Sequence, residues 1–194
     1  MMQWVPENRI DHTLIIGGTG MLADAAAHLS KRSKNLTSVA GTKRSLSKID
    51  LRIAKDCTHH SLQLNWNKPD EFLNRLRLHL GELMPPTLVL AWFHDNTLGP
   101  RTAELIERSS APCRFFQVLG SATADPRADA SKTLEAYRAP AHVVFHRVVL
   151  GFVETRSGSR WLTDSEISSG VLESIESGDE YSVVGCVEPW SSRP

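Results

Sequence analysis

Residues 12–23 constrain the fold of this chain more than any other part of the sequence. They read HTLIIGGTGMLA, an apolar run followed by a glycine-rich turn and then by small residues. The apolar run predicts a buried β-strand, and the small residues after the turn predict a helix that can pack closely on a sheet. A strand that passes through a tight turn into a helix is the first half of a βαβ unit, so the segment favours a parallel α/β sheet.

The spacing of the glycines also indicates a ligand. Gly17, Gly20 and Ala23 match the pattern G-x-x-G-x-x-[GA]. Residues without bulky side chains let backbone N–H groups approach a pyrophosphate at the N-terminus of a helix, where the helix dipole favours negative charge. The strand before the turn and the helix after it are the context that this pattern needs. We therefore predict a dinucleotide site, the alternative being a glycine turn that only tightens the connection.

The rest of the chain alternates between strand and helix patterns. Further strands are predicted over residues 36–41, 61–66, 87–93, 114–119, 142–153 and 181–187. Helices are predicted over residues 21–33, 46–57, 69–84, 101–110, 128–138 and 163–177. This order predicts an α/β protein with a three-layer, doubly wound Rossmann fold and a mostly parallel sheet of about seven strands. A single domain is expected over residues 12–187, between tails at 1–11 and 188–194.

Composition and charge exclude several classes of protein. The 194 residues include 22 basic and 22 acidic side chains, so the chain lacks the basic excess of a nucleic-acid-binding protein. Cys57, Cys113 and Cys186 have no metal-ligand spacing and fit a reducing compartment. No run approaches the roughly 18 apolar residues of a membrane span, and the N-terminus lacks the apolar core of a signal peptide. We expect a cytoplasmic protein with a small-molecule substrate and with no metal, membrane or nucleic-acid partner.

The glycine-rich turn resembles the nucleotide-binding loop of the short-chain dehydrogenases/reductases. Its G-x-x-G-x-x-[GA] form is closer to the extended and atypical branches of that superfamily, and the order of elements extends the resemblance over residues 12–187. The resemblance implies an NAD(P)-binding Rossmann fold and a homo-oligomer. It also implies a pyrophosphate site lined by Gly17, Thr19, Gly20 and Met21.

The same resemblance implies the roles of residues that follow the later strands. Asn65 stands where the family usually has an acidic residue near the adenine, with Trp66 beside it. Ala91 and Trp92 stand at the end of the fourth strand, where the family usually has an Asn-Ala-Gly segment. Ser121 stands at the end of the fifth strand, where the active-site serine of the family lies.

The sequence departs from the family at its catalytic pair, Tyr-x-x-x-Lys. Four residues after Tyr137 comes Ala141, and four residues after Tyr181 comes Gly185. In the family the lysine lowers the pKa of the tyrosine phenol, which tunes it for proton transfer near neutral pH. The chain therefore resembles divergent members of the superfamily, which lack this pair.

The loop after the second predicted strand bears on the choice of dinucleotide. The resemblance places residues 40–45 against the adenosine ribose, and no acidic residue occurs between positions 36 and 49 to accept a ribose 2′-hydroxyl. The loop instead carries two cations and two hydroxyl groups, on Thr42, Lys43, Arg44 and Ser45. A planar guanidinium suits bidentate binding of a phosphate, so NADP(H) is favoured over NAD(H). The alternative is a solvated basic loop.

Two residues are candidates for the chemistry. His94 follows the fourth strand at the carboxyl edge of the sheet and is a candidate general acid or base, the alternative being a histidine that binds the cofactor or caps the next helix. Ser121 is a candidate for orienting a carbonyl or imine, the alternative being a simple turn serine. Trp92, Phe93 and Trp161 form either an aromatic wall for a substrate or part of the core.

Two functions remain open at this stage. The first is an NADPH-dependent oxidoreductase that reduces a small carbonyl or imine without the usual Tyr-Lys pair. The second is a non-catalytic NADP(H)-binding sensor or regulatory protein. Residues 188–194 form an aromatic and basic tail, which we expect to be frayed. The alternatives for this tail are a fold over the pocket and a place in a dimer interface.

Overall fold

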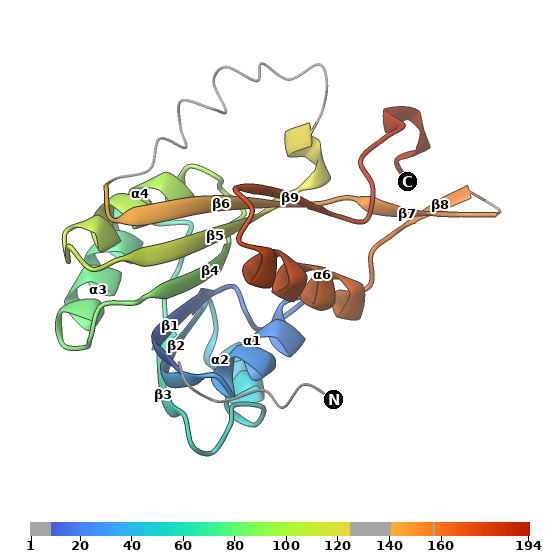
Figure 1. Cartoon of the computed structure of the whole chain (residues 1–194). Coiled ribbons are helices and arrows are strands. Elements are labelled where there is room, and N and C mark those ends of the chain that lie inside the picture. Colours follow the sequence, from blue (N-terminus) through green and yellow to red (C-terminus); the bar gives the residue numbers. More distant parts are fainter. Residues whose placement is uncertain (1–8, 125–140, 157) are drawn as a thin grey trace.

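The computed structural model describes residues 9–124, 141–156 and 158–194. In this part of the chain, seven parallel strands form one sheet in the order β3-β2-β1-β4-β5-β6-β9 (Figure 1). These strands are β1 (Ile10–Ile16), β2 (Ser33–Ala40), β3 (Thr58–Gln63), β4 (Leu88–Trp92), β5 (Cys113–Gly120), β6 (Val143–Leu150) and β9 (Tyr181–Val184). The order reverses between β1 and β4, which is the place where doubly wound sheets bind ligands beyond the carboxyl ends of their strands.

Helices cover both faces of the sheet (Figure 1). The described helices are α1 (Ala23–Ser30), α2 (Lys43–Asp50), α3 (Pro69–Gly81), α4 (Leu98–Glu107) and α6 (Asp164–Ser177). Side chains of α1, α2 and α6 belong to one apolar core, and those of α3 and α4 belong to the other. The fold is therefore the three-layer, doubly wound Rossmann fold that the sequence predicted.

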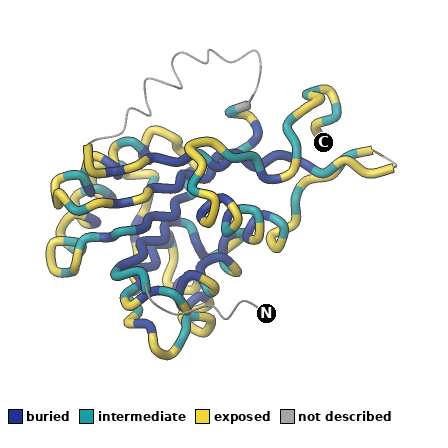
Figure 2. Tube along the Cα trace, in the orientation of Figure 1, coloured by how far each residue is buried: buried dark blue, intermediate teal, exposed yellow. Residues whose placement is uncertain are grey.

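Alternation along the strands creates the two cores. On β1, Ile15 belongs to the core under α1 and α6, whereas Leu14 and Ile16 belong to the core under α3 and α4. Successive side chains of a strand point to opposite faces, so a continuous apolar run is needed where both faces are covered. Figure 2 shows the result, a band of buried strands between partly exposed helices.

Several predicted boundaries differ from the structure. The helix predicted over 46–57 is α2, which begins at Lys43 because the side chain of Thr42 caps it, and which ends at Asp50. The strand predicted over 61–66 is β3 (Thr58–Gln63), so Asn65 and Trp66 lie in the loop after it. The first helix begins at Ala23 rather than at Met21. The helix predicted over 128–138, with Tyr137, lies outside the described residues.

The long strand predicted over 142–153 is divided at Gly151. A Cβ on Gly151 would stand 2.0 Å from the carbonyl oxygen of Cys186, so the chain needs a glycine at this crossing. After it, β7 (Phe152–Thr155) and β8 (Gly158–Trp161) form an antiparallel hairpin that extends away from the sheet (Figure 1). This hairpin was not predicted, because residues 142–153 were expected to form one continuous strand.

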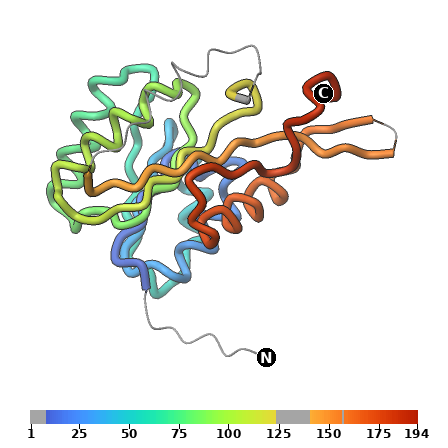
Figure 3. Tube along the Cα trace, turned by 45° about the horizontal axis from the view of Figure 1, so that its top comes forward, coloured from blue at the N-terminus to red at the C-terminus, as the bar shows by residue number. Residues whose placement is uncertain are grey.

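Residues 188–194 fold back over the protein instead of fraying. They include the short 3-10 helix η2 (Trp190–Ser192), and the hydroxyl of Ser159 on β8 donates a hydrogen bond to the carbonyl of Ser192. In Figures 1 and 3 this segment lies between the β7–β8 hairpin and the short 3-10 helix η1 (Ser121–Ala124). The segment is thus placed at the carboxyl edge of the sheet.

Two further features concern the described residues alone. None of their helices is long and apolar enough to cross a lipid bilayer. Among the same residues, no group of three or more His, Cys, Asp or Glu side chains is arranged to hold a metal ion.

Candidate functional site

The glycine-rich turn lies at the carboxyl end of β1, where the sequence placed it. Gly17 has a φ of +77°, a conformation that side chains disfavour, and a Cβ there would stand 2.8 Å from the carbonyl oxygen of Trp92. A Cβ on Gly20, in contrast, would meet no described atom within 4 Å. Gly17 therefore shapes the turn, and Gly20 leaves open space in front of α1.

Long-range hydrogen bonds hold this turn in place. The amide of Gly17 donates to the carbonyl of Val39 on β2 at 3.1 Å, and the buried hydroxyl of Ser168 on α6 donates to the carbonyl of Met21 at 2.8 Å. No hydrogen bond within the described chain uses the amides of Thr19 and Gly20. These amides precede the N-terminus of α1 and remain available for an anion.

The four predicted ribose residues form the first turn of α2 rather than a free loop. The hydroxyl of Thr42 accepts from the amide of Ser45 at 3.1 Å and donates to its hydroxyl at 2.9 Å, so these two side chains cap the helix. Lys43 and Arg44 are exposed, and the first turn contains no acidic residue. Two cations and a helix dipole therefore favour an anion at this point.

An aromatic residue borders the same region. The indole of Trp66 lies over Gly41, where a Cβ would stand 3.3 Å from the ring. Asn65 is exposed, and its side-chain oxygen accepts a hydrogen bond from the amide of Asn67 at 3.0 Å. The structure thus brings Trp66 close to the start of α2, as an adenine site there would require, and uses Asn65 within its own loop.

The end of β4 carries Ala91 and Trp92, which the structure places beside the glycine turn. Ala91 is buried under α3 and α4. The half-buried indole of Trp92 reaches along the carboxyl edge of the sheet, because its atoms lie 3.6 Å from Cβ positions built on both Gly17 and Gly120. Trp92 therefore forms an aromatic surface between the ends of β1 and β5.

His94 is exposed and stands between two indoles. Its ring centre lies 5.9 Å from that of Trp66 and 6.4 Å from that of Trp92. It does not cap α4, because the carboxylate of Asp95 accepts from the amide and hydroxyl of Thr97 at 2.9 and 2.7 Å. These hydrogen bonds lower the pKa of Asp95. His94 is thus available to a ligand at this edge.

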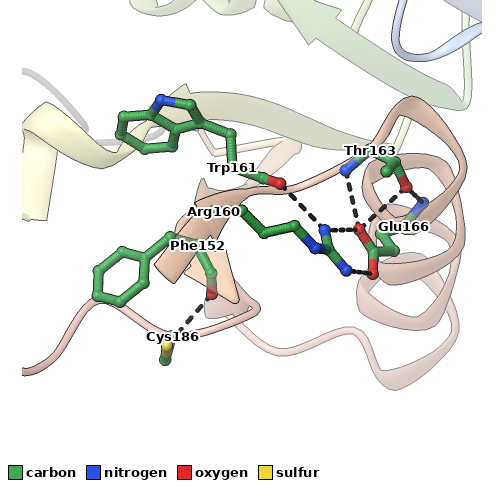
Figure 4. A network of polar contacts seen from close by, with 6 residues as sticks. All are labelled: Phe152, Arg160, Trp161, Thr163, Glu166 and Cys186. Atoms are coloured by element: carbon green, nitrogen blue, oxygen red, sulfur yellow. Dashed lines mark hydrogen bonds and ion pairs between the residues drawn. The ribbon is translucent and has the colours of Figure 1, made fainter. Parts of the chain in front are cut away.

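The structure separates the three aromatic residues for which a substrate wall and the core were the alternatives. Phe93 is buried in the core, where its ring meets Phe72 edge-on at 6.1 Å. Trp161 lies at the end of the β7–β8 hairpin, and its indole points away from Arg160 and Glu166 (Figure 4). Phe93 is therefore part of the core, whereas Trp161 lines a cavity at the carboxyl edge of the sheet.

Ser121 lies directly after β5 and is buried, with 5% of its surface exposed. It is not the residue that closes its turn, since the hydroxyl of Thr123 donates to the carbonyl of Gly120 at 2.8 Å. Instead, its hydroxyl oxygen accepts a 2.9 Å hydrogen bond from Nε of Arg193. No acceptor within the described residues takes the hydroxyl proton of Ser121, so the hydroxyl can donate it to a ligand.

A cavity of about 270 Å³ opens beside Ser121. Its lining combines few polar groups with a mainly apolar wall, from Gly120, Ser121, Ala122, Leu150, Gly151, Trp161, Leu162, Ile167 and Arg193. Concave apolar surfaces with a few polar groups are typical of small-molecule sites. The cavity lies at the carboxyl ends of β5 and β6, as a substrate site in this fold would.

The residues present fit a dinucleotide at the glycine turn. The open space at Gly20, the available amides before α1 and the acid-free start of α2 are each suited to a phosphate group. The residues that would hold such a group are Thr19, Gly20, Met21, Lys43 and Arg44, on the turn that Gly17 shapes. The described residues offer hydrogen-bond donors and cations for the phosphates of a dinucleotide.

Solved structures with the same fold were found, whereas no family model and no curated protein matches the sequence. The bulky-bulky ketone specific alcohol dehydrogenase from Comamonas testosteroni is similar, with a TM-score of 0.71, 15% identity, and coverage of 95% of this chain and 90% of that chain. A short-chain dehydrogenase from Sphingobium yanoikuyae in complex with NADPH gives a TM-score of 0.66, 14% identity and coverage of 94% and 91%. The RhlG/NADP active-site complex from Pseudomonas aeruginosa has a TM-score of 0.66 and 10% identity, and the match covers 90% of this chain and 94% of that chain. The protein therefore shares the Rossmann fold of these three structures.

Sequence reasoning missed two residues of the site. Ser168 holds the glycine turn from α6, and Arg193 reaches Ser121 from the other end of the domain. A serine on the buried face of an amphipathic helix was a weak signal for the first. The combination of Trp190 with Arg193 in a short terminal segment was a signal for the second, although it did not show which surface they would meet.

Proposed function

We propose that the protein is an NADPH-dependent oxidoreductase, a divergent short-chain dehydrogenase that reduces a small carbonyl or imine without the Tyr-Lys pair. The observation that carries the proposal is the open glycine turn at the point where the strand order reverses. The cations at the start of α2 favour NADP(H) because they would meet a 2′-phosphate. Two of the similar solved structures are complexes with NADPH and NADP, which supports the same choice.

The chemistry would divide between the cofactor and the residues of the cavity. When bound, the reduced nicotinamide supplies a hydride. Ser121 orients and polarises the electrophile with its hydroxyl proton, while Nε of Arg193 donates to the hydroxyl oxygen. His94, a water molecule or the substrate itself delivers the proton. An imine that is already protonated needs little acid catalysis, which suits a site that lacks the tyrosine and lysine.

Titration and turnover test this proposal directly. NADPH binding is measured by fluorescence, and turnover by loss of nicotinamide absorbance with a panel of ketones, aldehydes and cyclic imines. We expect Ser121→Ala to lower kcat by about 10²-fold while the Kd for NADPH stays unchanged, because one donor to the developing charge is lost. Ser169→Ala, an exposed position on α6, is the matched control. Failure to bind NADPH would contradict the proposal.

One observation favours a second function, a non-catalytic NADP(H)-binding sensor. The sequence lacks Tyr-x-x-x-Lys, the pair that performs proton transfer in the family. A sensor would bind NADPH with no turnover of any carbonyl or imine, and neither His94→Ala nor Ser121→Ala would alter that binding. Turnover that depends on Ser121 would exclude the sensor.

A further inference from the structure

Arg193 brings a cation to the cavity without an acidic partner. Its guanidinium carbon lies 5.2 Å from the ring centres of both Trp161 and Trp190, so two indoles hold the group by cation–π contacts. No carboxylate forms an ion pair with it among residues 9–124, 141–156 and 158–194. Arg193 is an exposed residue whose guanidinium two indoles and Ser121 hold beside an apolar wall, so the group is positioned to bind an anion that enters the cavity.

The segment that carries Arg193 is anchored at several points. Phe152 and Cys186 exchange backbone hydrogen bonds of 2.9 Å, which ties the start of the segment to the base of the hairpin. Ser159 binds the carbonyl of Ser192. The hairpin itself is fastened to α6, because the guanidinium of Arg160 binds both carboxylate oxygens of Glu166 at 2.8 Å (Figure 4). Trp161, the neighbour of Arg160, is thereby held where its indole meets Arg193.

The geometry around Ser121 indicates the kind of anion. Arg193 uses Nε for Ser121, so the two terminal amino groups of its planar fork remain for a carboxylate. The hydroxyl proton of Ser121 remains for a carbonyl oxygen. Because the two groups are in direct contact, a single ligand that satisfies both must carry its carboxylate next to its carbonyl. Leu150, Leu162 and Ile167 line the rest of the cavity and suit an apolar substituent.

We propose that the cavity takes a 2-oxo acid with an apolar side chain, and that Arg193 binds its carboxylate. The reductive step rests on the function proposed above. In it, the carbonyl carbon gains a hydride from the reduced nicotinamide, which becomes oxidised. The electron pair of the C=O bond moves to oxygen, the oxygen takes a proton from solvent, and a 2-hydroxy acid results. Arg193 is then a specificity-determining residue contributed by the C-terminal segment.

A matched pair of compounds tests the proposal by binding alone. Benzoylformate and its methyl ester share the carbonyl and the ring and differ in the charge that Arg193 would meet. Quenching of tryptophan fluorescence gives both Kd values, with and without NADPH. We expect the wild type to bind benzoylformate at least about tenfold more tightly than the ester, as one charge-assisted contact would give.

Substitutions test whether Arg193 causes the tighter binding of benzoylformate over its ester. Arg193→Gln is expected to weaken benzoylformate binding by about tenfold or more and to change ester binding less than about twofold. Arg193→Lys keeps the charge without the fork and should give an intermediate Kd. Arg156→Gln removes an exposed arginine elsewhere on the hairpin and should leave both Kd values unchanged.

The remaining outcomes also decide the proposal. The proposal would be overturned if the wild type bound benzoylformate and its methyl ester with equal Kd values. It would also be overturned if Arg193→Gln weakened the binding of both compounds equally. Deleting residues 188–194 should weaken benzoylformate binding, whereas tighter binding of both compounds would show that the segment obstructs the cavity and would overturn the proposal as well. If NADPH does not bind at all, the proposed oxidoreductase fails, yet the measurements on benzoylformate alone still decide the role of Arg193.

Discussion

The carbonyl oxygen of Trp92 lies 2.8 Å from the point where a Cβ on Gly17 would stand. The two residues lie at the ends of β1 and β4, the two strands between which the order of the sheet reverses. Together with the positive φ of Gly17, this short distance disfavours any side chain at this position in the folded protein. Gly20 differs, because a Cβ at this position would meet no described atom within 4 Å, so a side chain there does not disturb the fold. The two glycines of one motif can therefore be separated by experiment.

Gly20→Val is expected to fold normally and to lose NADPH binding, because its side chain would fill the space in front of α1 where phosphates would lie. Thermal unfolding and fluorescence titration measure the two effects separately. Gly17→Ala is the contrasting variant, and we expect it to lower the free energy of unfolding by about 1–3 kcal/mol because alanine is strained at this φ. A Gly20→Val protein that binds NADPH with wild-type affinity would show that the turn is not the phosphate site.

Arg44→Ala is expected to weaken NADPH binding by roughly 10- to 100-fold and NADH binding much less, since a charge-assisted hydrogen bond to the 2′-phosphate would be lost. Calorimetric titration of both coenzymes measures the difference. Lys48→Ala removes an exposed cation from the last turn of the same helix and is the control. Equal losses for the two coenzymes would contradict a role for Arg44 in binding the 2′-phosphate.

The sequence predicted the layered fold because its signals are local and repeated. Apolar runs mark strands that are covered on both faces, and helical spacing marks the helices between them. The helix starts predicted at Thr163 and Pro69 are confirmed to within one residue, since Thr163 and Glu166 form a capping box at α6 and Pro69 stands in the first turn of α3. Where apolar spacing alone was used, boundaries were wrong. Leu51 was assigned to a helix, but it follows the end of α2 and is 89% exposed.

The parts of the site that sequence reasoning missed depend on contacts between distant residues. Arg193 and Ser121 are 72 positions apart, and Ser168 and Met21 are 147 positions apart. No periodicity or local motif encodes such a pair. The break at Gly151 likewise depends on the backbone of Cys186, which follows α6 and β9 in the chain and lies against Gly151 in the fold. Local patterns thus locate the glycine turn, whereas the cavity beside Ser121 is formed by residues that only the folded structure brings together.

The capping box of α6 predicts a dependence of stability on pH. Glu166 accepts hydrogen bonds from Arg160 and from the amide and hydroxyl of Thr163, and these lower its pKa to about 2. Because the pKa is lower in the folded protein than in the unfolded chain, the stabilisation is complete above the usual carboxyl pKa. It is lost as the pH falls toward about 2.

Glu166→Gln is therefore expected to be less stable than the wild type near neutral pH, with a difference that narrows at acidic pH. Urea unfolding at about pH 7 and about pH 3 measures this change. Glu173→Gln, an exposed carboxylate on the same helix, should follow the wild-type profile. A Glu166→Gln difference that is constant with pH would contradict the assignment. Thr163→Ala should lower the free energy of unfolding by about 1 kcal/mol through loss of the cap.

A buried histidine at the start of β1 predicts a second dependence on pH. His12 is fully buried, with Nδ1 lying 2.6 Å from the carbonyl oxygen of Met84 and Nε2 lying 2.9 Å from the hydroxyl of Thr37. The neutral ring satisfies both partners by donating from Nδ1 and accepting at Nε2. Burial lowers the pKa of His12, and the nearby His60 and His79 lower it further.

The sign of the effect follows from where the proton binds. The unfolded chain takes up a proton on His12 near the usual histidine pKa of 6.5, whereas the folded protein resists it until a lower pH. Stability is therefore complete above about pH 6.5 and falls as the solution becomes more acidic. Burial also lowers the pKa values of His59 and His79, so they contribute in the same direction.

His12→Gln is expected to reduce the loss of stability between about pH 7.5 and about pH 5.5, because one proton-linked group is removed while a donor and an acceptor remain. The residual loss comes from His59 and His79. Urea unfolding across this range gives the slope of the free energy of unfolding against pH. His28→Gln, an exposed position on α1, should keep the wild-type profile. If His12→Gln keeps the wild-type slope as well, the buried ring does not control acid stability, and the acid loss must be assigned to the other two histidines.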